Sequence, residues 1–195
     1  MTNIIGIDFS MNCAVGCIKY DSNIEYLMPE KHSGKFSAKY YQNDTPFNSA
    51  TTFSALLPVE RPSIIAIEGG SFSSVGRTFD ISECLGRLLY RLESMYPGVT
   101  IIRPSPKTIK KFATGSGNAT KAQMIEAWSK ETNNPIQYKY HKKTKVQLGI
   151  NEDSPWSDIA DAYYMMRYAE DTALGLILPV VKVKKPRKTS KKSTK

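Results

Sequence analysis

The sequence predicts an α/β domain with a mixed sheet flanked by helices, and three observations lead to that prediction. Two short β-branched runs, Ile4–Ile7 and Ile64–Ile67, are typical of strands buried on both faces. Two more strand-like segments follow the first run and are joined by a tight turn, which indicates an antiparallel start. The later strands alternate with helical segments, as in an α/β fold. We therefore expect a five-stranded sheet of mixed direction.

The remaining predicted strands are bounded by turn-forming residues. They cover Cys13–Tyr20, Ile24–Met28 and Val99–Ile102, and Asp21-Ser22-Asn23 is a suitable hairpin turn between the first two of these. Residues 30–48 are polar and show no clear period, so we expect a loop there, with room for one short strand. Residues 132–153 are also expected to form a loop.

Five segments are predicted to be helical: Ser49–Val59, Thr78–Tyr96, Lys107–Phe112, a helix beginning after Thr120, and Trp156–Ala173. Apolar residues recur every three or four positions along the second of these, which predicts one packed face. Gly86 in its middle costs about 1 kcal/mol relative to Ala. We take it as a candidate for close approach to another element.

The starts of the last two helices carry recognisable signals. Thr120-x-x-Gln123 forms a capping box. Ser154 can serve as the N-cap of the final helix, and Pro155 suits its first helical position.

Length and composition limit the classes of protein to which this chain can belong. A chain of 195 residues with 41% apolar residues fits one domain with a real core. No apolar run approaches the roughly 18–20 residues needed to span a bilayer, and the N-terminus does not resemble a secretion signal. The cysteines, Cys13, Cys17 and Cys84, include no CxxC pair, so we expect them to be small core residues. These features favour a cytoplasmic protein.

The positive charge is concentrated at the C-terminus. Residues 182–195 hold eight basic residues and no acid, which leaves +1 of the net charge of +9 for the rest of the chain. The segment is also rich in Ser and Thr, so we divide the chain into a domain over 1–178 and a disordered basic tail over 179–195. Such a tail favours contact with nucleic acid, although a solubilising or targeting extension is an alternative.

Four carboxylates form the candidate site. Asp8 and Glu68 follow the two buried strands, and Asp158 and Asp161 lie three residues apart on one face of the last helix. Buried acids are costly unless paired or bound to a cation. Oxygen ligands suit Mg²⁺ or Mn²⁺ rather than zinc, and two such ions about 3.5–4 Å apart can activate water against a phosphodiester. The structural alternative is a turn-capping Asp8 and an acidic helix start favoured by the helix dipole.

Four segments, in order, resemble the RuvC-type Holliday junction resolvases of the RNase H-like superfamily. They are Ile4-Ile5-Gly6-Ile7-Asp8, Ile65-Ala66-Ile67-Glu68, the run Thr114-Gly115-Ser116-Gly117-Asn118-Ala119-Thr120-Lys121-Ala122-Gln123, and Ser157-Asp158-Ile159-Ala160-Asp161-Ala162. The resemblance covers roughly residues 3 to 170. It implies an RNase H-like fold and a homodimeric, metal-dependent endonuclease that resolves branched DNA.

By the same resemblance, Asp8, Glu68, Asp158 and Asp161 are the catalytic residues and the ligands of two Mg²⁺ or Mn²⁺ ions, with Asp8 bridging them. The products would carry 3′-OH and 5′-phosphate ends. The chain departs from the family in Phe9-Ser10, where a Pro-containing turn is usual, and in a longer segment before the last helix. Short, divergent members occur in bacteriophages and large DNA viruses, so a bacterial or phage-infected cell is the expected setting.

The candidate DNA-binding residues are one aromatic and six basic side chains: Phe72, Arg77, Arg103, Lys107, Lys110, Lys111 and Lys121. Phe72 is the nearest match to the family's aromatic wedge, but it is one position off. Lys121 begins a helix beside a Gly-rich loop, where it can pair with a phosphate held by backbone N–H groups. A solvated lysine face is the alternative for each basic residue.

Two further features leave their roles open. The segment Tyr138–Lys145 interleaves rings with positive charge, which suits stacking on unpaired bases but also an ordinary surface loop. The helix around Gly86, with Leu85, Leu88, Leu89 and Leu92, is the candidate dimer contact.

Three other functions remain as alternatives. One is an RNase H-like nuclease that cuts flaps, forks or RNA–DNA hybrids. An actin-like nucleotide-binding domain also begins with such an Asp-ended strand, but it needs two phosphate loops and a larger chain. A basic, non-catalytic DNA-binding module would not require all four acids.

Overall fold

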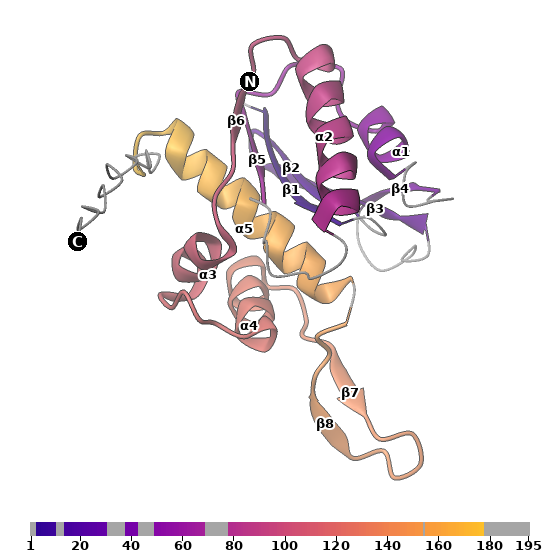
Figure 1. The fold of residues 1–195 in the computed structure, drawn as a ribbon. Helices are drawn as coiled ribbons and strands as arrows, with labels where there is room; N and C mark the ends of the chain where they lie inside the picture. Colours follow the sequence, from indigo (N-terminus) through magenta and orange to yellow (C-terminus); the bar gives the residue numbers. More distant parts are fainter. Residues whose placement is uncertain are drawn as a thin grey trace, which may run out of the picture.

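The computed structural model describes residues 3–10, 14–30, 38–42, 49–68, 78–153 and 155–177. Its elements alternate as the sequence predicts (Figure 1). In chain order they are β1 (Asn3–Phe9), β2 (Ala14–Tyr20), β3 (Asn23–Pro29), β4 (Ala38–Tyr41), α1 (Ser49–Ala55), β5 (Ile64–Ile67), α2 (Thr78–Met95), β6 (Thr100–Ile102), α3 (Pro106–Thr114), α4 (Lys121–Thr132), β7 (Tyr138–Tyr140), β8 (Gln147–Ile150) and α5 (Trp156–Ala173).

The main sheet has six strands in the order β4-β3-β2-β1-β5-β6. β1, β2 and β3 pair antiparallel, whereas β5 pairs parallel with β1 and β6 pairs parallel with β5. The mixed α/β architecture is therefore confirmed, but the expected count of five strands is wrong. The sixth strand is β4, a short edge strand parallel to β3.

β4 is the short strand for which the polar segment 30–48 left room, and a long-range contact holds it at the edge of the sheet. Of the four residues of β4, Tyr41 is the one that is buried. The Tyr41 hydroxyl donates to the carbonyl oxygen of Ala14 at 2.6 Å and accepts the Ala14 amide at 2.9 Å. This anchor joins residues 27 positions apart, so no local pattern reveals it.

Helices cover both faces of the sheet (Figure 1). α1 and α2 pack on one face with Ile5 and Ile7 of β1, and α3, α4 and α5 pack on the other face with Ile4. Because successive side chains of a strand point to opposite faces, Asp8 lies on the same side as Ile4. The alternation of β1 therefore directs Asp8 toward α5.

The first two helices differ from expectation in their details. α1 ends at Ala55, short of the expected Val59. In α2, Leu85, Leu88 and Leu92 are buried against the sheet, so they cannot form the dimer contact assigned to them. A Cβ placed on Gly86 would have no heavy atom within 4 Å among the described residues, so the expected close approach is wrong.

The segment over residues 132–153 is not a plain loop. It contains β7 and β8, which form a separate antiparallel hairpin. The two strands are only three and four residues long and bury almost no side chains, so the sequence shows no buried face from which a hairpin could be recognised.

The helix starts are partly as predicted. The capping box is confirmed: Thr120 Oγ1 accepts the Gln123 amide at 3.2 Å, and Gln123 Oε1 accepts the Thr120 amide at 2.9 Å. Pro155 occupies the N-cap of α5 rather than its first turn and makes no side-chain cap. Ser154, the expected cap, lies outside the described residues.

The remaining composition-based expectations concern membranes and cysteines. Within the described residues, none of the helices combines the length and apolarity needed for a membrane span. Cys17 and Cys84 are buried, as expected for core residues, and Cys13 lies outside the described residues.

Candidate active site

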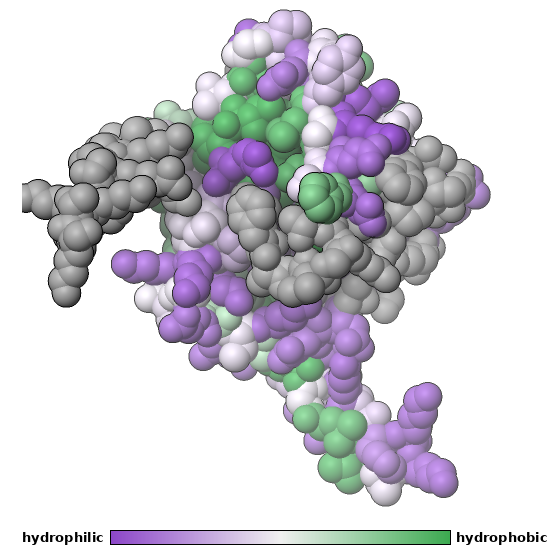
Figure 2. All heavy atoms as spheres, viewed as in Figure 1, coloured by the Kyte–Doolittle hydropathy of each residue, from purple (hydrophilic) through white to green (hydrophobic). Residues whose placement is uncertain are grey.

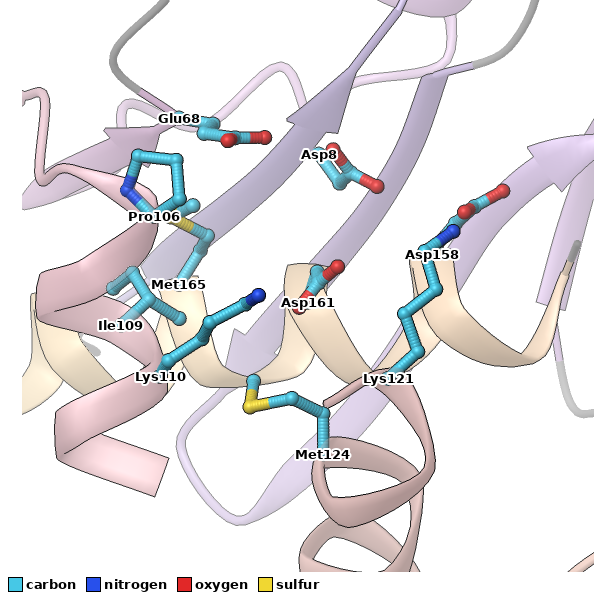
Figure 3. A pocket seen from close by; sticks show the side chains of 10 residues that line it. All are labelled: Asp8, Glu68, Pro106, Ile109, Lys110, Lys121, Met124, Asp158, Asp161 and Met165. Carbon is cyan, nitrogen blue, oxygen red and sulfur yellow. The ribbon is translucent and has the colours of Figure 1, made fainter. Parts of the chain in front are cut away.

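One pocket gathers the four predicted carboxylates. Asp8 of β1, Glu68 after β5, and Asp158 and Asp161 of α5 line a pocket of about 340 Å³. Figure 3 shows Asp8 between Glu68 and Asp158, with Asp161 beside it on the helix. Four acids from three elements far apart in sequence therefore meet at one end of the sheet.

The pairing of β1 with β5 brings the first two acids together. The strands run parallel with Ile7 opposite Ile67, and the Glu68 amide donates to the Ile7 carbonyl at 3.4 Å. Asp8 and Glu68 therefore come directly after two residues, Ile7 and Ile67, that are paired across neighbouring strands. Their side chains point to the same face, toward α5.

The other two acids reach Asp8 because α5 crosses β1 at close range. Gly6 lies at the crossing, where the α5 backbone occupies the space that a side chain would need. Asp158 and Asp161 are three residues apart, so they share the face of α5 that lines the pocket. The final helix thus completes the site that β1 and β5 begin.

Burial raises the pKa values of Asp8, Glu68 and Asp161, and repulsion between the acids adds to the effect for Asp8 and Asp161. The pKa of Asp8 is well above its usual value because of desolvation, reinforced by the charges of Asp161, Asp158 and Glu68. Desolvation, with Glu68 and Asp158, raises the pKa of Asp161 to about 7. The pKa of Glu68 is also raised by desolvation. The cluster therefore resists carrying all its negative charges unless a cation is present.

Two lysines supply part of the opposing charge. Lys110 of α3 and Lys121 of α4 line the pocket with their ammonium groups directed inward (Figure 3). Lys121 lowers the pKa of Asp8 and Asp161, while Lys110 lowers that of Glu68 and Asp161, but burial outweighs both.

Ser157 is a residue of the site that the sequence did not single out. It is buried, its hydroxyl donates to Asp158 Oδ1 at 2.9 Å, and Lys121 Nζ lies 3.5 Å from the same hydroxyl. Ser157 thus links Lys121 to Asp158 and restrains the orientation of that carboxylate. A small polar residue beside an acid on an apolar helix is the only signal that could have indicated it.

The chemistry of the donor set fits a divalent cation. Carboxylate oxygens suit Mg²⁺ or Mn²⁺, and the raised pKa values show that the cluster lacks positive charge. Within the part of the chain that is described, no three acidic, imidazole or thiol groups are already close enough to form a metal site. The described residues therefore place suitable ligands around one pocket without forming a closed metal site.

Three of the other predicted DNA-binding residues lie outside the pocket lining. Arg103, Lys107 and Lys111 are exposed on the segment from the end of β6 through α3. Phe72 and Arg77 fall outside the described residues.

The phosphate contact predicted at the Gly-rich loop stays a prediction, and the loop has few backbone N–H groups left to make it. Most of its amides donate within the chain, namely those of Gly115, Ser116, Asn118, Ala119 and Thr120. Gly115 instead ends α3, with a left-handed backbone at φ 80°. Lys121, which follows the loop, lines the pocket with its side chain.

Comparison with known proteins gives a match in structure but not in sequence. No family model and no curated protein matches the chain. The solved structure of Thermus thermophilus RuvC matches with a TM-score of 0.55 and 14% identity, over 89% of this chain and 97% of that one. T. thermophilus RuvC in complex with a Holliday junction substrate matches with a TM-score of 0.56 and 14% identity, over 88% and 98%.

The chain has the RNase H-like fold of RuvC. The match spans nearly the whole of both chains. At 14% identity it shows the fold alone. The argument for function therefore depends on the pocket.

Proposed function

We propose that this protein is a divalent-metal-dependent endonuclease that cuts branched DNA, with four-way junctions as its preferred substrate. One observation carries the proposal: four carboxylates and two lysines line a single pocket at the end of the sheet. A phosphodiester needs both kinds of group, because its cleavage requires activated water and stabilisation of added negative charge. The RuvC-like fold and the junction bound by the T. thermophilus protein support the choice of substrate.

Asp8, Glu68, Asp158 and Asp161 would hold the ions, because their carboxylates line the same pocket. When bound, Mg²⁺ or Mn²⁺ supplies an acidified water and neutralises charge on the phosphate. Water attacks the phosphorus and the bond to the 3′ oxygen breaks, which leaves 3′-OH and 5′-phosphate ends.

The chain's own residues prepare the pocket for that reaction. Ser157 holds Asp158 through its hydrogen bond, which preserves the carboxylate's direction in the absence of substrate. Lys121, whose charge acts on Asp8 and Asp161, is placed to offset charge that develops on the scissile phosphate. The apolar walls made by Ile109, Met124 and Met165 limit water around these groups and strengthen their interactions.

Exposed basic residues would hold the DNA outside the pocket. Arg103, Lys107 and Lys111 lie on the segment that carries Lys110, so they extend positive charge away from the acids. Phe72 and Arg77, which follow Glu68 in the sequence, remain proposed contacts at the branch point.

A homodimer is part of the proposal, because a junction with two-fold symmetry requires two coordinated cuts. Leu89 of α2 is only partly buried, and Phe79 and Tyr90 are exposed on the same helix at 90% and 72%. We place the contact on this outer side of α2. Light scattering of Tyr90→Glu should report a monomer where the wild type is a dimer, and a monomeric wild type on junction DNA would exclude the dimer.

The deciding experiment compares substrates. Matched four-way junction, flap, fork, RNA–DNA hybrid and linear duplex are incubated with protein and Mg²⁺, Mn²⁺ or EDTA. We expect paired incision of the junction with either metal and none in EDTA. Preferential cutting of flaps, forks or hybrids would identify a different RNase H-like nuclease, and the absence of cutting on any substrate would refute the proposal.

A further inference from the structure

The β7–β8 hairpin extends away from the body of the molecule. It forms its own two-stranded sheet and projects beyond α4 and the N-terminal end of α5 (Figure 1). Every residue from 137 to 148 is exposed. At the base of the hairpin, Ile150 packs against the hydrophobic core. A ribbon placed in this way contributes little to the core and is available for a partner.

The charge of the hairpin selects an anionic partner. Between Glu131 and Glu152 the chain holds four lysines and no acid. Three of them, Lys142, Lys143 and Lys145, occupy the turn, and all are exposed. This density of positive charge without counter-charge favours a phosphate backbone.

Hydrogen bonds give the turn a defined shape. The His141 amide donates to the Val146 carbonyl at 2.8 Å, and the Lys145 amide donates to the His141 carbonyl at 2.9 Å. His141 Nδ1 accepts the Thr144 amide at 3.2 Å and lies 2.9 Å from its hydroxyl. The imidazole therefore organises the turn, and the lysines project from a structured tip.

The base of the hairpin is tied to the segment that leads into the catalytic helix. The Asn151 amide donates to the Gln137 carbonyl at 2.8 Å, and Lys139 Nζ pairs with Asp153 Oδ2 at 2.9 Å. The Trp156 amide donates to the Asp153 carbonyl at 3.0 Å, which begins α5. DNA held by the tip would thus lie on the side of the molecule where Asp158 enters the pocket.

The strands themselves suit contact with a nucleic acid. Tyr138 and Tyr140 are two residues apart on β7, so they share a face, and they are 39% and 53% exposed. Leu148 on β8 is 63% exposed. Figure 2 shows apolar and polar residues side by side on this projecting end. A two-stranded ribbon has the width that the major groove of DNA admits.

We propose that the β7–β8 hairpin is a second DNA-binding site, which holds a duplex arm beside the incision site. Lys142, Lys143 and Lys145 bind backbone phosphates, and the exposed ring face of β7 lies against the groove. This inference rests on the proposed function, because it takes branched DNA as the substrate.

The test measures DNA binding without cleavage. Full-length wild type and the triple variant Lys142→Gln, Lys143→Gln, Lys145→Gln are titrated with four-way junction in EDTA at several salt concentrations. We expect the variant to bind roughly 10- to 100-fold more weakly and its salt slope to fall by about 2–3, since each lost phosphate contact removes about 0.9. Incision at saturating DNA with Mg²⁺ should stay within about twofold, because none of these residues lines the pocket.

A control variant with the same net charge as the hairpin variant separates the loss of a specific site from the loss of overall positive charge. Lys39→Gln, Arg87→Gln and Lys130→Gln replace three exposed cations on other elements. Lys39 and Arg87 form surface ion pairs, which contribute little to stability. We expect this control to bind junction within about threefold of the wild type.

The outcomes distinguish the two proposals. Equal affinity and equal salt slope for wild type and hairpin variant would overturn the second site, while wild-type incision of the junction would keep the nuclease assignment. Equal losses in the hairpin variant and in the control would also overturn it, because bulk charge would then explain the effect. A wild type that neither binds nor cuts branched DNA would overturn both.

Discussion

Gly6 of β1 and Met166 of α5 are in direct backbone contact. A Cβ built on Gly6 would lie 2.1 Å from the Met166 amide nitrogen and 2.3 Å from the Ala162 carbonyl oxygen. No side chain fits at that distance, so the crossing of α5 over β1 requires glycine. Because Asp161 directly precedes Ala162, this contact also sets how near the helix acids come to Asp8.

Gly6→Ala should therefore damage both stability and incision. We expect a loss of about 3 kcal/mol or more in the free energy of unfolding, at the upper end for overpacked sites. Urea denaturation measures it, with incision assayed below the unfolding transition.

Gly86→Ala is the matched control for that substitution. Its added Cβ would meet nothing within 4 Å among the described residues, and replacing a mid-helix glycine stabilises by up to about 1 kcal/mol. Equal destabilisation by the two substitutions would contradict the close-packing explanation.

The raised pKa values predict how stability depends on pH without metal. Burial raises the folded-state pKa of Asp161 to about 7, above the unfolded value of about 3.9. The folded protein thus favours the protonated form. This contribution to stability is complete below about pH 4 and is lost as pH rises through about 7. In EDTA, wild type should lose stability over this range relative to Asp161→Asn.

Mg²⁺ should reverse part of that loss. An ion that binds the folded state and not the unfolded one raises the free energy of unfolding by mass action, and it binds best when the acids are ionised. We expect a larger rise in melting temperature with Mg²⁺ at pH 8 than at pH 5. An equal rise at both pH values, or none at either, would contradict a carboxylate site for the ion.

Lys121 should affect the chemical step more than DNA binding. Because its charge lowers the pKa of Asp8 and Asp161, Lys121→Met should move the acid limb of the incision profile to higher pH. We also expect kcat to fall by about 10- to 100-fold, as for the loss of one charge-stabilising donor. Lys111→Met is the control on α3, outside the pocket lining, and should leave the pH profile unchanged. A shift of equal size in both variants would contradict the role given to Lys121.

Deleting residues 182–195 should weaken binding to all DNA shapes alike. The segment holds eight basic residues, so the salt slope should fall by as much as about 7 if each one releases a counterion. Incision of saturating junction should persist. A selective loss of junction preference, measured against linear duplex, would make this segment part of substrate recognition.

The fold was predictable where burial imposes a pattern. The β-branched runs that end at Asp8 and Glu68 became paired central strands, and the capping box at Thr120 begins α4. The position of β4 in the sheet and the β7–β8 hairpin were not predicted, because one depends on the distant Tyr41–Ala14 contact and the other on backbone pairing between short, exposed segments.

The grouping of the four acids was also predictable, because strand ends and helix spacing are local features. The surroundings of the acids were not. Ser157 becomes a partner of Lys121 only when α4 packs against α5. Likewise, the leucine spacing in α2 correctly predicted a helix, but the leucines were wrongly assigned to a dimer contact. An apolar stripe does not show whether the sheet or a second chain covers it.

The most direct test separates binding from cutting in four single variants. Asp8→Asn, Glu68→Gln, Asp158→Asn and Asp161→Asn each remove one charge and little volume. Asp171→Asn is the control, since it changes an acid about 15 Å further along α5 and outside the pocket lining.

Junction affinity in EDTA and incision with Mg²⁺ are measured for all five variants. We predict that each pocket variant binds junction as the wild type does but loses incision by orders of magnitude, while the control retains both. Near-normal incision by two or more of the pocket variants would show that these carboxylates are structural, and it would contradict the nuclease assignment.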